Sequence, residues 1–249
     1  MAKGDGMWMA ILKSIITAVA VSSGKDMAKA TPELWKNVKD WWQGKCIAVI
    51  GPTASGKNTM FSKLAKLPPA AEYTQTRGAE NVGKFDFSWP LPNKTDIKFT
   101  CKRSINVGGE LDERERFWAQ SCKGADVIFY LIDFEKLVAA PDITLARIKD
   151  DLKWMLSNFN EFKSSSVVHI LLNKIDIVHG DDLNEEDEAT FYREVEEKIK
   201  YIQALAEKHL AGYFKRVTGI TPISMVNNYL FKRYFTASLE QVFSRESGK

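Results

Sequence analysis

The stretch Gly51-Pro52-Thr53-Ala54-Ser55-Gly56-Lys57-Asn58 decides the class of fold to which this chain belongs. It follows the apolar run 46–50 and leads, from Thr59 onward, into a segment of helical character. Two glycines separated by four residues, with a lysine at the start of a helix, are typical of a P-loop. In a P-loop the backbone N–H groups and the positive end of the helix surround phosphate oxygens. Lys57 is expected to reach the outer phosphates. The sequence therefore predicts a phosphate-binding site formed by Gly51, Thr53, Ala54, Ser55, Gly56, Lys57, Asn58 and Thr59.

Length and composition fit a globular protein. The chain has 249 residues, of which 45% are hydrophobic and 27% charged, so it can form one large domain or one domain with appendages. The net charge of +3 is too small to indicate a nucleic-acid partner. Cys46, Cys101 and Cys122 are odd in number and lack metal-ligand spacing, which predicts reduced cysteines and a cytoplasmic location.

Residues 1–44 are predicted to form a helical extension. The apolar segment 7–22 is shorter than the roughly 20 residues that span a bilayer, and Lys13 interrupts it. It could lie on a membrane or a partner as a peripheral anchor, or pack on the protein's own core. A second helix is predicted over 32–43, and its tryptophans could contact lipid or a partner, or could cover the edge of the following domain.

From Cys46 onward, strand-like and helix-like segments alternate. The runs 84–89 and 96–107 are expected to pair as a hairpin, and the apolar runs 127–132 and 167–172 to form buried strands. A last strand is predicted over 217–225, and helices are predicted over 142–159, 188–210 and 228–243. This order indicates an α/β fold whose mostly parallel sheet is covered on both faces. Ligands of such sheets bind at the carboxyl ends of the strands.

The motifs at those ends resemble the motifs of a known family. A P-loop, then Asn106-Val107-Gly108-Gly109, then Asn173-Lys174-Ile175-Asp176 is an order similar to that of the Ras-superfamily small GTPases. The local likeness is nearest to the branch of Arf and the β-subunit of the signal-recognition-particle receptor, and it covers about 45–245. The resemblance implies a three-layer α/β/α P-loop G domain over 45–249, with GTP or GDP and Mg²⁺ as ligands. It also implies a molecular switch with a protein effector or regulator.

The resemblance assigns roles to individual residues. Asn173 and Asp176 look like the guanine-reading pair, Lys174 would lie along the base, and Ser224-Met225 is similar to the last guanine-contacting loop. Thr76 and Gly109 are similar to the residues that sense the γ-phosphate. The alternative is that they are a threonine of an ordinary polar loop and a glycine of a β-turn. The implied catalytic set is Lys57, Thr76, Gly109 and Glu110, and the implied metal set is Asn58, Thr76 and Asn106.

Three departures from the family pattern fall on the metal and hydrolysis positions. Asn58 replaces a hydroxyl ligand, Asn106 replaces an aspartate, and Glu110 replaces a glutamine that orients water. These changes predict weak metal binding and slow intrinsic hydrolysis. Two alternatives stay open. One is a pseudo-GTPase that only binds nucleotide. The other is an ATPase or nucleotide kinase in which Asp133, at the end of an apolar strand, is the acidic residue.

Overall fold

The computed structural model describes residues 32–64, 85–91, 94–102, 111–179 and 185–247. The strands are β1 (Cys46–Ile50), β2 (Phe85–Pro90), β3 (Asp96–Lys102), β4 (Val127–Asp133), β5 (Val167–Asn173) and β6 (Val217–Ile223). The α-helices are α2 (Pro32–Trp42), α3 (Lys57–Leu64), α4 (Leu111–Cys122), α5 (Phe134–Ala139), α6 (Pro141–Asn158), α7 (Ile175–His179), α8 (Glu185–Leu210) and α9 (Asn228–Ser247). Two 3₁₀ turns, Phe159–Glu161 and Ala211–Arg216, follow α6 and α8.

The strands form one six-stranded sheet in the order β2-β3-β1-β4-β5-β6. All neighbouring pairs are parallel except β2 and β3, which pair antiparallel with Phe87 opposite Phe99. The predictions of a mostly parallel sheet and of a hairpin between the second and third strands are therefore confirmed. From the carboxyl end of β1 the chain leads to β2 and β3 on one side, whereas from the carboxyl end of the adjacent β4 it leads to β5 on the other side. The carboxyl end of β1 is thus the point where the strand order reverses, and such points are where open α/β sheets bind ligands.

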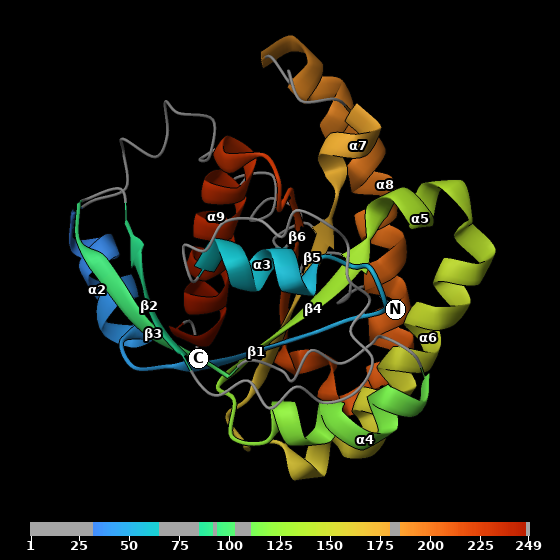
Figure 1. The fold of residues 1–249 in the computed structure, drawn as a ribbon, viewed down its shortest axis with the longest axis horizontal. Coiled ribbons are helices and arrows are strands. Elements are labelled where there is room, and N and C mark those ends of the chain that lie inside the picture. The colour runs from blue at the N-terminus through green and yellow to red at the C-terminus, as the bar shows by residue number, and fades with distance from the viewer. Residues whose placement is uncertain (1–31, 65–84, 92–93, 103–110, 180–184, 248–249) are drawn as a thin grey trace, which may run out of the picture.

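Helices cover both faces of the sheet, as Figure 1 shows, with α3 and α9 on one side of the strands and α4 and α6 on the other. Side chains of successive strand residues point to opposite faces, and β4 shows this directly. Phe129 packs against Phe235 of α9, whereas Tyr130 packs against Trp118 of α4. All seven residues of β4 and of β5 are buried, which explains why both strands are continuous apolar runs in the sequence.

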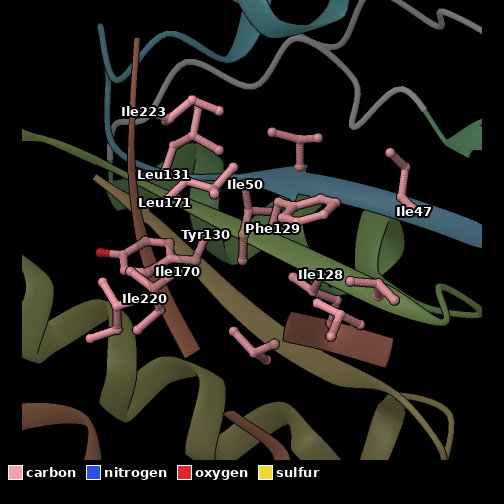
Figure 2. Packing of buried hydrophobic residues seen from close by; sticks show 14 of the residues in the cluster. Ile47, Ile50, Ile128, Phe129, Tyr130, Leu131, Ile170, Leu171, Ile220 and Ile223 are labelled. Carbon is pink, nitrogen blue, oxygen red and sulfur yellow. The ribbon is translucent and has the colours of Figure 1, made fainter. Parts of the chain in front are cut away.

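The pairing register of the strands places side chains that share a face next to one another across the sheet. Tyr130 pairs with Ile170, and Ile170 pairs with Ile220, so their side chains lie together on one face in Figure 2. Leu131 and Leu171 pair in the next register position, and their side chains lie together on the opposite face. The core is therefore built as two apolar layers, one on each side of the central strands.

Helix α2 packs into the same core as the sheet. Trp35 and Trp42 are fully buried, and the indole N–H of Trp42 donates to the carbonyl oxygen of Leu239 in α9 at 2.8 Å. The helix ends before Gly44, whose φ of +74° turns the chain into β1. The predicted helix over 32–43 is confirmed, and its two buried tryptophans cover the protein's own core.

Several predicted boundaries were wrong. Strand β6 ends at Ile223 and not at 225, because the hydroxyl of Ser224 accepts the backbone N–H groups of Val226 and Asn227 and turns the chain. Helix α8 begins at Glu185, three residues earlier than expected, and α9 continues to Ser247. Helix α5 was not predicted, because six residues are too few for a helical period to show.

No helix in the described part of the chain is both long and apolar enough to cross a membrane. The apolar segment 7–22 lies outside the described residues.

Candidate functional site

The loop between β1 and α3 has a backbone that depends on its two glycines. Gly51 has a φ of +153°, and a Cβ placed on it would lie 2.5 Å from the carbonyl oxygen of Leu131. Gly56 has a φ of +100°, and a Cβ there would lie 2.0 Å from Nδ2 of Asn173. Both positions exclude side chains because the neighbouring strands β4 and β5 approach the loop closely. Ala54 also has a positive φ, of 64°.

Lys57, the first residue of α3, lies back over this loop. Its side chain is buried, and Nζ donates to the carbonyl oxygens of Gly51 at 2.7 Å and Pro52 at 2.8 Å. The ammonium group is therefore held at the loop and not in bulk solvent. Asn58 follows with an exposed side chain, and Thr59 is half-buried. The amide of Asn58 is thus available at the first turn of α3, where the positive end of the helix dipole also lies.

Asn173 connects three loops that are distant in the sequence. It ends β5, is buried, and donates from Nδ2 to the carbonyl oxygen of Ser55 at 2.8 Å. Its Oδ1 accepts the backbone N–H of Met225 at 3.1 Å. Ser224, next to Met225, is fully buried. The structure therefore brings the predicted residues Ser55, Asn173, Ser224 and Met225 together at the carboxyl edge of the sheet.

Asp176 lies in the first turn of α7, three residues after Asn173. Its side chain is 6% exposed, and Oδ1 is buried without a hydrogen-bond partner among the described residues. Leaving a buried acceptor without a donor costs about 1–3 kcal/mol. The hydroxyls of Thr53 and Ser55 in the β1–α3 loop are also buried without a described partner. Unpaired polar atoms on both sides of Asn173 are the arrangement expected of a site that receives its hydrogen-bond partners from a ligand.

Lys174 has a partner that the sequence did not reveal. With a backbone φ of 72°, its Nζ lies 2.7 Å from Oδ2 of the buried Asp133 and 3.6 Å from Oε2 of Glu135. Oδ1 of Asp133 accepts the backbone N–H of Lys136 at 3.1 Å and so caps α5. The one sequence signal was an aspartate at the end of a buried strand, which is a common N-cap residue.

The predicted residues Thr76, Asn106, Gly109 and Glu110 lie outside the described residues. Of the predicted metal set, the structure therefore places Asn58 alone. Within the described ranges, no group of three His, Cys, Asp or Glu side chains could hold a metal ion.

The fold and the site define an α/β protein whose loops converge at the carboxyl edge of a mostly parallel sheet. No family model and no curated protein matches the chain. One solved structure to which it is similar is a crystal structure of a variant of SsGBP. That similarity covers 96% of this chain and 70% of the other, with 17% sequence identity and a TM-score of 0.49.

Proposed function

We propose that this chain is a P-loop G-domain protein of the small GTPase type, which binds GTP and GDP and acts as a molecular switch. The observation that carries the proposal is the position of Asn173. Its amide makes hydrogen bonds to the loop before α3 and to the loop after β6. Three residues later, Oδ1 of Asp176 is buried without a hydrogen-bond partner among the described residues. A further support is that the loop before α3 follows β1, where the strand order reverses.

Asp176 accounts for a preference for guanine. A carboxylate can accept two hydrogen bonds at once, and guanine offers a ring N–H and an exocyclic amine side by side. Adenine offers an amine but no neighbouring ring N–H, so the buried carboxylate would stay partly unpaired. The penalty of about 1–3 kcal/mol corresponds to an affinity for adenine nucleotides that is lower by about fivefold to 150-fold.

The loop before α3 accounts for binding of the phosphates. Its backbone N–H groups and the N-terminal end of α3 attract anions, and Lys57 can exchange the carbonyl oxygens of Gly51 and Pro52 for phosphate oxygens. The exchange replaces hydrogen bonds from Lys57 to neutral carbonyl oxygens by charge-assisted contacts with phosphate oxygens.

Hydrolysis is proposed to be slow without a partner. Magnesium, when bound, would neutralise charge on the phosphates, and the exposed amide of Asn58 could contact it through its oxygen. The departures from the family pattern at Asn58, Asn106 and Glu110 support slow hydrolysis, because they fall on the metal and water positions. Rapid magnesium-dependent GTP turnover by the purified protein would contradict slow hydrolysis.

The first test is to denature the purified protein and identify any released nucleotide by chromatography, where GDP or GTP is expected. Competition against fluorescent GDP follows, in which unlabelled GDP should displace the probe and ATP should not. Displacement by ATP would favour the ATPase or kinase alternative. That alternative is less well supported, because both carboxylate oxygens of Asp133 are already occupied by Lys174 and Lys136. GDP binding without any turnover, with partners present, would favour the pseudo-GTPase.

A membrane or partner contact is proposed for 7–22. Trp35 and Trp42 of α2 are buried, and the partly buried Trp41 packs against the core, so these tryptophans serve the protein's own core. Removing residues 1–24 should abolish binding to liposomes, and unchanged binding would contradict the proposal.

A further inference from the structure

We propose that Asp133 is a positioning residue that couples the base end of the nucleotide site to its phosphate end. The inference rests on the proposed function, because it concerns how the same site holds its ligand. Asp133 ends β4 directly opposite Asn173 of β5, so it lies beside the base-binding segment without belonging to the predicted motifs.

The first arm of this coupling is the ion pair with Lys174. Oδ2 of Asp133 lies 2.7 Å from Nζ of Lys174, and the carboxylate is buried while the lysine side chain is 24% exposed. A lysine side chain has many accessible rotamers, so a fixed partner is needed to hold it in one conformation. Glu135, at 3.6 Å and 46% exposed, is a more distant partner in a more solvated position. Asp133 is therefore the group that fixes Lys174 along the proposed base position.

The second arm runs through α5. Oδ1 of Asp133 accepts the N–H of Lys136 and caps this six-residue helix. The side chain of the same Lys136 reaches the loop before α3, where Nζ donates to the carbonyl oxygen of Thr53 at 3.3 Å. One buried carboxylate thus positions a lysine at the base and a second lysine at the phosphate loop.

The decisive experiment measures the release of fluorescent GDP from the full-length Asp133→Asn variant by stopped flow. Asparagine keeps the size and can still accept the capping hydrogen bond, but it removes the charge that holds Lys174. We expect GDP to dissociate about tenfold faster, a change that corresponds to about 1.4 kcal/mol.

Asp126→Asn is the matched control. Asp126 precedes the same strand at its opposite end, and like Asp133 it accepts one backbone N–H, from Cys46 at 2.8 Å, and pairs with one lysine, Lys163 at 2.9 Å. This substitution should change the release rate less than about twofold, because it lies at the amino edge of the sheet, away from the site. An equal effect of both substitutions would show a general loss of stability and would overturn the inference.

A double-mutant cycle separates positioning from a structural role. If Asp133 acts through Lys174, the double variant Asp133→Asn/Lys174→Gln should release GDP at nearly the rate of Lys174→Gln alone. Fully additive effects would overturn the proposed action of Asp133 through Lys174.

The variant Lys136→Met tests the contact with the phosphate loop. It changes an exposed side chain and should fold even if Asp133→Asn does not. It should speed release by about twofold to fivefold, since an exposed contact is worth up to about 1 kcal/mol. An unchanged rate of GDP release from Lys136→Met would overturn the proposed connection through Lys136 to the phosphate loop.

The outcomes also separate this inference from the proposed function. Failure of the wild-type protein to bind GDP would overturn the proposed function and the inference together. Tight binding by wild type with unchanged release from Asp133→Asn would overturn the inference alone.

Discussion

Arg114 of α4 and Asp151 of α6 form a buried ion pair, with Nη1 and Oδ1 2.8 Å apart. Asp151 is fully buried and also accepts hydrogen bonds from Arg147 Nε at 2.8 Å and from the hydroxyl of Tyr130 at 2.9 Å. Burial raises the pKa of Tyr130 well above its usual value, so this hydroxyl stays protonated and donates. The network joins α4, α6 and β4 on one face of the sheet.

Replacing Asp151 by alanine should therefore destabilise the protein strongly. The change leaves Arg114 buried without its main counter-charge and Tyr130 without its acceptor, and we expect the free energy of unfolding to fall by about 3–5 kcal/mol. Urea denaturation measures this change. Glu196→Ala is the control, because Glu196 pairs with Lys200 at the surface of α8, and its loss should cost no more than about 0.5 kcal/mol. Similar losses for both variants would contradict the role given to the buried network.

The burial of His169 in its neutral form leads us to expect a specific dependence of the protein's stability on pH. Its side chain lies between the hydroxyls of Thr218 and Thr221, each 2.9 Å from a ring nitrogen, and burial lowers its pKa from 6.5 to about 3. Between these two values the unfolded chain binds a proton that the folded protein does not. Stability contributed by the neutral histidine is therefore fully present above pH 6.5 and falls by about 1.4 kcal/mol per pH unit below it.

The measurement is urea denaturation of wild type and His169→Gln between pH 7.5 and 4.5. The variant cannot titrate at this position, so its stability should fall less steeply below pH 6.5, although it is less stable at neutral pH. Parallel curves for the two proteins would refute the assignment of a depressed pKa.

Gly56→Ala should disrupt the site and the fold locally. The new Cβ would lie 2.0 Å from Nδ2 of Asn173 at a backbone φ of +100°, so Asn173 would have to leave Ser55. Strain of this kind costs about 1–3 kcal/mol, and we expect GDP binding to fall at least tenfold. Gly212→Ala is the matched control, since a Cβ there meets nothing within 4 Å. Calorimetric titration with GDP distinguishes the two variants, and wild-type affinity in Gly56→Ala would contradict the geometry.

Asp176→Asn should change the preferred base. An amide can donate where the carboxylate could only accept, so it suits xanthine, which has a carbonyl in place of the exocyclic amine of guanine. We expect GDP affinity to fall by about tenfold or more and the affinity for xanthosine diphosphate to rise. Direct binding of both nucleotides to wild type and variant tests this, and an unchanged preference would remove Asp176 from base recognition.

Much of the fold could be predicted because it depends on local patterns in the sequence. The apolar runs that became β4 and β5, the alternation that became β2, and the glycine loop before α3 each depend on neighbours within a few residues. Helix α5 was not predicted because it has only six residues, between a buried strand and a longer helix. A segment this short shows no helical periodicity of apolar residues. The end of β6 was misplaced because a side-chain contact of Ser224, and not an apolar pattern, terminates the strand.

The amino-acid sequence by itself determined the alternation of strands and helices and the residue types at the ends of the strands, because these depend on local propensity and spacing. Only the tertiary structure decided which of those residues meet. Asn173 lies 118 residues from Ser55, and Lys174 lies 41 residues from Asp133, yet each pair is in hydrogen-bond contact. Such contacts depend on strand order and register, which place residues side by side through the pairing of whole strands. No spacing along the chain encodes that pairing.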